Sequence, residues 1–305
     1  MEKRDFISIA DLSRSDIEML FDRAELLKKE VKAGEYRRTL EGRTLAMIFE
    51  KPSTRTRVSF EAGMTQLGGH AQYLSPSDTQ IGRNEPLKDT ARVLAAYCDG
   101  ILIRTYAHNN VIDLARWSDV PVINGLSDFL HPCQVLSDIF TIREHFGSLE
   151  GVRVSYVGDG NNVANSWILG ASRMGLPLTI ACPEGHDPGA EVLAQGLEGT
   201  GASVTVARDP REAVEGAKVV YTDVWASMGQ EHEASARQKI FAPYRVNDSL
   251  LKLAAPDAVV MHCLPAHRGE EITDDVAEGP QSIIITQAAN RLHVQKAILE
   301  WLMAH

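Results

Sequence analysis

Cysteine is scarce in this chain, and its spacing gives no sign of a disulfide framework. The 305 residues include only Cys98, Cys133, Cys182 and Cys263, and no two of them form a Cys-x-x-Cys pair. Scattered single cysteines are typical of reduced thiols in the cytosol, and they give no support to a structural zinc site. We therefore expect no bound metal and a reducing compartment.

Long hydrophobic runs are also missing. No segment approaches the ~20 apolar residues that would span a bilayer. The charged residues at positions 2–5 are followed by a charged helix, so the uninterrupted apolar core of a signal peptide is missing. Positive charge is not in excess either, because the net charge is −10. Nucleic acid and anionic membrane are therefore not expected as main partners, any bound anion needs a local basic site, and a cytoplasmic location is expected.

Low-complexity tracts and internal repeats are absent, and 44% hydrophobic with 24% charged residues is ordinary for a folded protein. Apolar segments alternate with helical patterns along the chain, which predicts parallel sheets covered by helices on both faces. The predicted strands are 44–50, 100–106, 121–124, 152–157, 177–182, 203–207, 218–224 and 258–263, and the predicted helices of the first half include 54–67, 86–97, 109–116 and 132–145.

This pattern predicts two doubly wound α/β domains. Gly147 and Gly151 flank the expected junction, so we assign residues 1–146 to a first domain and 147–285 to a second. The last amphipathic stretch, 286–305, has no strand after it to belong to, and we expect it to pack back against the first domain. In open α/β sheets, ligands bind beyond the carboxyl ends of the strands, and pockets often lie between domains.

One run is dense in groups that bind phosphate. Ser53, Thr54, Arg55, Thr56 and Arg57 follow the strand 44–50 and begin a helix. Free backbone N–H groups and the helix dipole favour an anion there, and arginine adds paired donors that match phosphate oxygens. Ser53 could instead simply cap the helix, but the density of the run favours an anion site.

Two further polar groups stand at predicted strand ends of the first half. Arg104 closes the strand 100–106, at the sheet edge where the phosphate run emerges, and is a candidate second phosphate ligand. His131 and Gln134 begin the helix 132–145, with Pro132 at its first position. His131 could donate to a carbonyl oxygen and Gln134 could bind an amide, although a capping histidine and a surface glutamine would look the same.

A glycine turn opens the second half but lacks the third glycine of a dinucleotide fingerprint. Gly158 and Gly160 are followed by Asn161 and Asn162, and the third glycine is replaced, since Ala164 and Asn165 follow. A nucleotide-dependent oxidoreductase is therefore disfavoured. The two asparagines at the top of a strand suit a small polar ligand.

Two more strand ends carry candidate ligand groups. Asp223, Ser227 and Met228 follow the strand 218–224 and could grip an amino group, although an ordinary turn fits as well. Cys263 and Leu264 follow the strand 258–263. Since neighbouring residues of a strand point to opposite faces, His262 and Cys263 are not expected to form a nucleophilic pair.

Together, Ser53-Thr54-Arg55-Thr56-Arg57, His131-Pro132-Cys133-Gln134, Asp223 with Ser227-Met228-Gly229, and His262-Cys263-Leu264-Pro265 resemble the aspartate/ornithine carbamoyltransferase family. The likeness runs nearly end to end. The first two motifs mark carbamoyl phosphate binding in general, and the last two resemble the ornithine-specific branch.

The resemblance implies a role for each matching residue. Ser53, Thr54, Arg55, Thr56 and Arg104 would hold the phosphate, with Gln80 reaching in from an adjacent subunit of a homotrimer. His131, Arg104 and Thr56 would polarise the carbamoyl oxygen. Its NH₂ would be bound by Gln134 and the carbonyls of Cys263, Leu264 and Arg291. Ornithine would be held by Asn162, Asp223, Ser227 and Met228.

The implied reaction needs no cofactor and takes place in a cleft between the domains. The neutral δ-amine of L-ornithine attacks the carbamoyl carbon of carbamoyl phosphate, giving citrulline and phosphate, as in arginine biosynthesis. Since a free δ-amine has a pKa near ~10.4, Asp223 beside Cys263 is our hypothesis for the group that favours its neutral form. Open alternatives are a sister transferase for putrescine or an N-acylated ornithine, and a non-catalytic anion-binding regulator.

Overall fold

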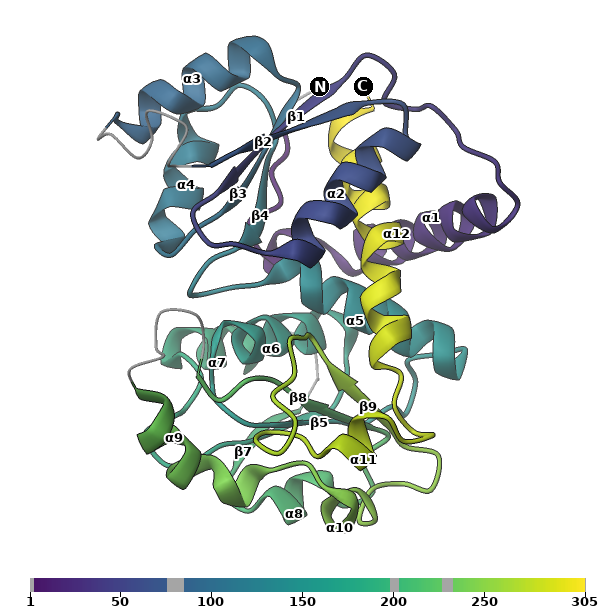
Figure 1. The fold of residues 1–305 in the computed structure, drawn as a ribbon, viewed down its shortest axis with the longest axis vertical. Helices are drawn as coiled ribbons and strands as arrows, with labels where there is room; N and C mark the ends of the chain where they lie inside the picture. The colour runs from purple at the N-terminus through teal and green to yellow at the C-terminus, as the bar shows by residue number, and fades with distance from the viewer. Residues whose placement is uncertain (1–2, 76–84, 198–202, 227–232, 305) are drawn as a thin grey trace. The chain divides into compact units, whose positions relative to one another are not determined.

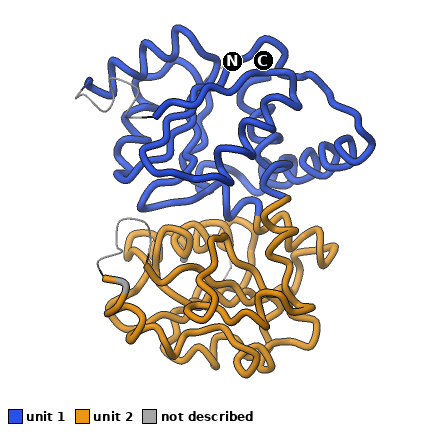
Figure 2. Tube along the Cα trace, in the orientation of Figure 1, with its two compact units in different colours: residues 1–137, 290–305 blue, residues 138–289 orange. Residues whose placement is uncertain are grey.

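The computed structural model describes residues 3–75, 85–197, 203–226 and 233–304, which form two compact α/β units (Figures 1 and 2). Unit 1 comprises residues 1–137 and 290–305, and unit 2 comprises residues 138–289. Each unit has its own parallel sheet flanked by helices. The predicted fold class, two doubly wound α/β domains, is confirmed.

The first unit is built on a four-stranded parallel sheet with the order β2-β1-β3-β4. Its elements, in chain order, are η1 (Ile9–Asp11), α1 (Arg14–Lys32), β1 (Thr44–Phe49), α2 (Thr54–Gln66), β2 (His70–Leu74), α3 (Leu87–Tyr97), β3 (Gly100–Arg104), α4 (His108–Trp117), β4 (Val122–Leu126), the start of α5 (Pro132–Phe146) and the end of α12 (Ile284–Met303).

Both faces of this sheet are covered, because its central strands are apolar on both sides. Alternate residues of β1 and β3, such as Ile48 and Ile101, pack with Ala91 of α3 and with Val111 and Leu114 of α4 in one buried cluster. In Figure 1, α2 and α12 lie on the side of the sheet away from α3 and α4. The sheet is thus enclosed by helices, as expected for a doubly wound unit.

Helix α12 returns to unit 1, as the sequence predicts for the C-terminal segment. It runs beside α2, where Gly63 leaves room for the side chains of Lys296 and Leu299. Its Glu300 accepts hydrogen bonds from Arg23 of α1, at 2.5 and 2.8 Å, and from Thr39. These contacts tie the last residues of the chain to its first helix.

The second unit is built on a five-stranded parallel sheet with the order β7-β6-β5-β8-β9. Its elements are β5 (Val154–Val157), α6 (Asn162–Met174), β6 (Leu178–Ala181), α7 (Ala190–Leu197), β7 (Val204–Ala207), α8 (Pro210–Val214), β8 (Val219–Thr222), α9 (Ala234–Phe241), η5 (Ala242–Tyr244), α10 (Asp248–Leu251), β9 (Val259–His262) and α11 (Asp274–Ala277). The remainder of α5 and the first residues of α12 complete it.

Each face of the second sheet has a distinct core. On one face the rings of Tyr156 and Tyr221, paired across β5 and β8, stack at 5.6 Å, and Trp167 of α6 meets Tyr221 edge-on. On the other face Val220 and Val260 pack with residues of α8, α10 and α11. The apolar side chains on both faces of these strands are therefore buried.

Strand β2 is the one strand of the described sheets that the sequence analysis does not predict. Its residues, His-Ala-Gln-Tyr-Leu, are half-exposed, and the strand pairs only with β1 at the edge of the sheet. An edge strand does not need the buried β-branched run by which the other strands are recognised.

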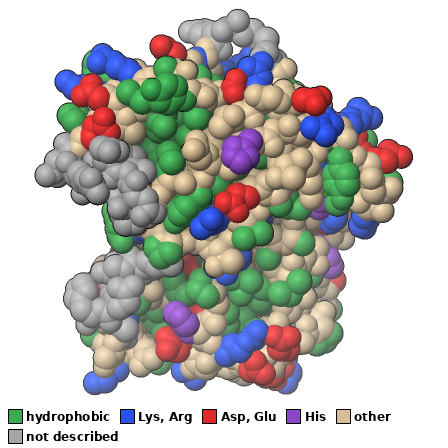
Figure 3. All heavy atoms as spheres, turned by 45° about the horizontal axis from the view of Figure 1, so that its top comes forward, with side chains coloured by type: hydrophobic (Ala, Val, Ile, Leu, Met, Phe, Trp, Pro, Cys, Tyr) green, Lys and Arg blue, Asp and Glu red, His purple; other side chains and the backbone are tan. Residues whose placement is uncertain are grey.

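No described helix combines the length and the low polarity needed to cross a membrane. On the face drawn in Figure 3, acidic and basic side chains of the described residues are interspersed.

Candidate active site

Each unit has one topological switch point, where successive crossover connections leave in opposite directions from two neighbouring strands. In unit 1 it lies between β1 and β3, and in unit 2 between β5 and β8. The carboxyl ends of such strands are the usual ligand site of an open α/β sheet. The candidate residues predicted from the sequence cluster after these strands and after the neighbouring β9.

The phosphate run of unit 1 begins α2 directly beyond β1. Ser53 is the N-cap of the helix, and its hydroxyl accepts a hydrogen bond from the Thr56 N–H at 3.3 Å. Thr56 is fully buried, and its hydroxyl accepts from a guanidinium nitrogen of Arg291 at 2.8 Å. The capping interpretation of Ser53 is therefore correct, and a buried arginine from the last helix stands beside the same helix start.

Three arginines surround a neutral histidine at this switch point. His131 is buried at the start of α5. Burial lowers the pKa of its imidazole well below the ordinary value, and the positive charges of Arg291, Arg104 and Arg55 lower it further. At neutral pH the ring is thus uncharged and carries one N–H donor. Gln134, one turn along α5, is buried as well.

Arg104 comes into this group through strand pairing. It is the last residue of β3 and lies opposite Phe49 of β1, so the two loops that follow these strands start side by side. The predicted meeting of Arg104 with the phosphate run at one sheet edge is correct.

Arg57 belongs to a different surface. Its guanidinium pairs with Glu61 at 3.0 Å and stacks 3.8 Å from the ring centre of Tyr73. The sequence itself contains the signal, because Glu61 follows at the i+4 spacing of a helical ion pair.

Lys51 is a buried residue at this site that sequence reasoning missed. Only 3% of its surface is exposed, and its ammonium group pairs with Asp128 and lies 4.3 Å from the ring centre of Tyr106. Lysine is almost never buried without a partner. Its position in the sequence, between a buried strand and the phosphate run, could have indicated that Lys51 belongs to the site.

Cys133, in the His131 motif, is part of the core. Burial raises the pKa of its thiol to about 12, and the sulfur donates to the carbonyl of Asn124 at 3.4 Å. It is therefore a thiol rather than a thiolate at neutral pH, and it supports the start of α5.

In unit 2 the switch point carries a carboxylate held by three donors. Oδ1 of Asp223 accepts from the Cys263 thiol at 2.8 Å and from the Val224 N–H at 2.8 Å, while Oδ2 accepts from the Asn161 amide at 2.8 Å. Asp223 is buried. The predicted neighbourhood of Asp223 and Cys263 is correct.

The two asparagines after β5 have different positions. Asn161 caps α6, since its Oδ1 accepts from the N–H groups of Val163 and Ala164 at 2.9 and 3.1 Å, and its amide nitrogen reaches Asp223. Asn162, the predicted ligand residue, is the first residue of α6 and is half-buried. The sequence suggests both asparagines as ligands for a small polar molecule and the resemblance implies only Asn162, whereas in the structure it is Asn161 that binds Asp223.

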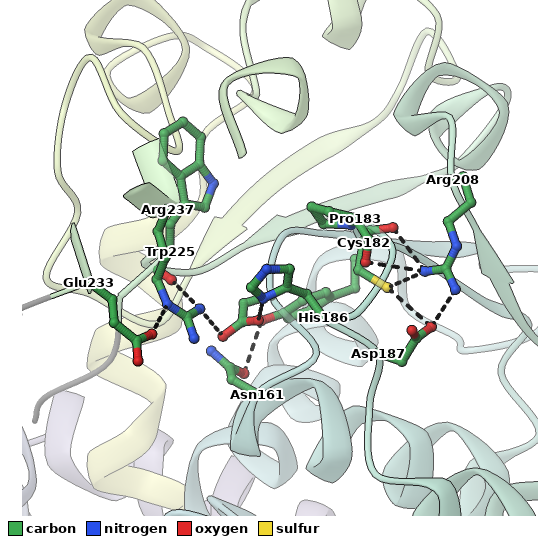
Figure 4. A network of polar contacts seen from close by, with 11 residues as sticks. Asn161, Cys182, Pro183, His186, Asp187, Arg208, Trp225, Glu233 and Arg237 are labelled. Carbon is green, nitrogen blue, oxygen red and sulfur yellow. Dashed lines mark hydrogen bonds and ion pairs between the residues drawn. The ribbon is translucent and has the colours of Figure 1, made fainter. Parts of the chain in front are cut away.

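A buried arginine joins the β5 and β8 loops (Figure 4). One guanidinium nitrogen of Arg237, on α9, donates to Asp159 at 3.0 Å and to the Trp225 carbonyl at 2.9 Å, and Glu233 pairs with its Nε. Burial raises the pKa of Asp159 despite the opposing charges of Arg237 and His186. Two contacts therefore join the loop that carries Asn161 to the loop that carries Asp223: the Arg237 guanidinium, and the hydrogen bond between Asn161 and Asp223.

His262 and Cys263 are closer than expected. One possible ligand atom from each of Asp223, His262 and Cys263 lies within 4.8 Å of the others. The prediction of opposite faces was wrong because β9 ends at His262, so strand alternation does not extend to Cys263. Both ring nitrogens of His262 already have partners, Glu271 and the Leu264 N–H, so this group is arranged for hydrogen bonding rather than metal coordination.

The glycine turn after β5 serves chain packing. A Cβ atom added at Gly160 would lie 2.3 Å from the backbone of Asp187 and Pro188. The backbone N–H of Gly160 donates to the His186 carbonyl. Close approach of another loop explains this glycine. Gln80, Ser227 and Met228 lie outside the described residues.

Comparison with known proteins assigns both units. The carbamoyl-P binding domain of aspartate/ornithine carbamoyltransferases matches residues 4–144, and the Asp/Orn binding domain of the same family matches residues 150–302. The chain belongs to the aspartate/ornithine carbamoyltransferase family. The predicted resemblance is confirmed.

Ornithine carbamoyltransferases of other organisms match nearly the whole chain. An ornithine carbamoyltransferase of Syntrophus aciditrophicus is 55% identical over 99% of this chain and 100% of its own length. An anabolic ornithine carbamoyltransferase of Pyrococcus furiosus is 52% identical over 98% of this chain and 96% of its own length. A solved structure of ornithine carbamoyltransferase from Pyrococcus furiosus superposes with a TM-score of 0.95 at 52% identity, covering 98% of this chain and 97% of that one.

Proposed function

We propose that this chain transfers the carbamoyl group of carbamoyl phosphate to the δ-amine of L-ornithine, giving L-citrulline and phosphate. The observation that carries the proposal is the neutral His131 among Arg55, Arg104 and Arg291. Three fixed positive charges suit a phosphate dianion, and a neutral imidazole suits hydrogen bonding to a carbonyl oxygen. The relatives named ornithine carbamoyltransferase, 55% and 52% identical, support the same reaction.

Most of the residues proposed for carbamoyl phosphate stand at the first switch point. Ser53, Thr54, Arg55, Thr56 and Arg104 hold its phosphate, and Arg104, His131 and Thr56 polarise its carbonyl. Gln134 and the carbonyls of Cys263, Leu264 and Arg291 bind its NH₂. Donors fixed in advance stabilise the oxyanion that forms when the amine attacks, because they need no reorganisation during the step.

Ornithine takes the second set, comprising Asn162, Asp223, Ser227 and Met228. Among the described residues, three donors fill both acceptor positions of Asp223 Oδ1 and one of the two on Oδ2. One position on Oδ2 is therefore left for an amino group of the substrate. We assign it to the δ-amine, beside Cys263, so Asp223 serves one amino group rather than two.

No protein group is needed as a dedicated base. The amine proton passes to an oxygen of the departing phosphate, whose negative charge the arginines neutralise.

We further propose the biosynthetic direction, towards arginine, and a cytoplasmic location. The first follows the anabolic relative of Pyrococcus furiosus, and the second follows the absence of disulfide bonds among the four cysteines.

The test is an acceptor panel. Citrulline or its analogue is measured with carbamoyl phosphate and, in parallel, L-ornithine, putrescine, N-acetylornithine and L-aspartate. Turnover with ornithine alone is expected. Turnover with another amine would keep the carbamoyl phosphate assignment and overturn the acceptor. No turnover in any well would support an anion-binding protein instead.

We also propose a homotrimer in which Gln80 completes the site of an adjacent subunit. Light scattering should give three times the mass of one chain. An active monomer would exclude any role for Gln80 between subunits.

A further inference from the structure

A buried histidine that is hydrogen-bonded to groups outside the proposed substrate set holds the loop that carries Cys263 and Leu264. His262 is the last residue of β9 and is 1% exposed. Its Nε2 lies 3.0 Å from Glu271 Oε1, and its Nδ1 lies 2.8 Å from the Leu264 backbone nitrogen. The side chains of both His262 and Glu271 are fully buried.

The backbone contact fixes the tautomer of this ring. A backbone N–H can only donate, so Nδ1 of His262 must be the acceptor and carries no proton. The proton is therefore on Nε2, which donates it to the Glu271 carboxylate. A carboxylate orients the histidine, and the histidine orients a peptide group.

The peptide group that His262 holds is the one between Cys263 and Leu264. Because a trans peptide is planar, its N–H and its C=O point in opposite directions. Fixing the Leu264 N–H towards His262 therefore points the Cys263 carbonyl away from the ring. Leu264 also has φ +60°, the only positive φ of a non-glycine residue in the described part of the chain. A leucine stays in this region only when its surroundings enforce it.

Glu271 also fixes the other end of the same loop. Its Oε1 accepts from the His267 N–H at 2.6 Å, so one carboxylate oxygen binds both His262 and His267. The backbone nitrogen of His262 in turn donates to Gln287 at 2.9 Å. Residues 263–266 are thus held between two anchored positions.

We propose that His262, oriented by Glu271, is a positioning residue that aims the Cys263 carbonyl at the NH₂ of carbamoyl phosphate. This inference rests on the proposed function and deepens it. His262 contacts no substrate in this account. Its effect is on the affinity for the carbamoyl group, not for the phosphate.

Two amide substitutions of His262 distinguish the roles of its two ring nitrogens. In His262→Asn the side-chain oxygen takes the place of Nδ1 and still accepts from Leu264, whereas in His262→Gln the longer amide reaches Glu271 but leaves Leu264. We expect His262→Asn to keep the KM for carbamoyl phosphate within about 3-fold of the parent. In His262→Gln it should rise about 10-fold, the effect of one or two lost hydrogen bonds.

Two controls accompany the swap. Inorganic phosphate, whose ligands lie in unit 1, should bind both variants as it binds the parent. Glu271→Gln keeps an acceptor for His262 and His267 and should behave like His262→Asn. Equal KM values for the two His262 variants would overturn the inference, while the parent's citrulline formation would stay intact. Failure of the proposed function would instead abolish turnover in the parent itself.

The parent protein gives a test that needs no variant. Nitrogen-15 NMR of the imidazoles should show the His262 ring with its proton on Nε2 and none on Nδ1. A ring protonated at Nδ1 would overturn the inference whatever the variants do.

Discussion

At the scale of the single residue, burial and neighbouring charge decide what each group can do. His131 is the clearest case, because desolvation and three arginines all disfavour its charged form. An imidazolium there would add a fourth positive charge and would lack the solvation that stabilises a charged group in water. The ring is thus kept neutral, which suits the proposed hydrogen bond to a carbonyl oxygen.

This neutral state predicts a pH dependence of stability. The folded-state pKa of His131 lies well below 6.5, so as the pH falls below that value only the unfolded chain takes up this proton. The stabilisation is complete above pH 6.5 and is lost at up to about 1.4 kcal/mol per pH unit below it. Urea unfolding at pH 6.5 and 5.5 should show His131→Asn losing less stability than the parent. Equal losses would contradict the assignment.

Local sequence predicts residues whose partners are local. Ser53 caps α2 and Pro132 begins α5, as their positions before apolar helices indicate. The burial of Lys51 and the bond between Asn161 and Asp223 were not predictable in this way. Their partners, Asp128 and Asp223, are distant in the chain, and only the assembled sheet brings them together.

At the scale of the element, the loops at the switch point of unit 2 are held by a group outside the proposed substrate set. Arg237 on α9 binds Asp159 and the Trp225 carbonyl, and so it joins the loop after β5 to the loop after β8. Asp223 and Asn161 stand in those two loops. Their relative position should depend on this guanidinium.

Arg237→Met therefore has a predicted effect on one substrate. It removes the ion pair of the buried Asp159, and we expect a loss of about 1.5–3 kcal/mol of unfolding free energy and a several-fold higher KM for ornithine, with little change in the KM for carbamoyl phosphate. Lys239→Met, on the exposed side of the same helix, removes the same charge and should change neither quantity. Steady-state kinetics and denaturant unfolding measure both. Parallel rises of the two KM values in Arg237→Met would count against a positioning effect.

The anchoring of α12 gives a prediction for stability alone. Glu300 is 8% exposed and accepts from Arg23 and Thr39. Glu300→Gln should cost about 1.5–3 kcal/mol, the range for hydrogen bonds to charged groups. Glu25→Gln breaks the exposed pair with Lys29 and should cost at most about 0.5 kcal/mol. Chemical denaturation compares them, and similar costs would mean that the return of α12 depends on apolar packing instead.

Strand prediction followed composition rather than place in the sheet. The edge strand β7 is partly exposed but has a β-branched run, and it was predicted, as were the mainly apolar β1 and β9. The half-exposed β2 was not, because its stability comes from pairing with β1 rather than from its own composition.

At the scale of the whole molecule, the chain builds two units with the same plan. It passes from unit 1 to unit 2 within α5 and returns within α12. A crossing inside a continuous helix leaves no glycine or proline and no change of composition at that point. The two-domain architecture was therefore predictable from the alternation of strands and helices, whereas the residues at which the units divide carry no local signal.

The division of labour between the units is the central claim of this account. Unit 1 presents arginines, Thr56 and a neutral His131, and unit 2 presents the Asp223 carboxylate with Cys263. If the unit 1 set binds the phosphate and carbonyl oxygen of carbamoyl phosphate and the Asp223 carboxylate binds ornithine, substitutions at Thr56 and at Asp223 should have separable effects on the two Michaelis constants.

The most direct measurement compares Thr56→Val with Asp223→Asn in citrulline formation. Thr56→Val removes a hydroxyl from the carbamoyl phosphate set, and Asp223→Asn removes a charge from the ornithine set. We predict at least about a 10-fold rise in the KM for carbamoyl phosphate in the first variant, and a comparable rise in the KM for ornithine in the second. The reverse pattern, or equal rises of both constants in both variants, would contradict the assignment of Thr56 to carbamoyl phosphate and of Asp223 to ornithine.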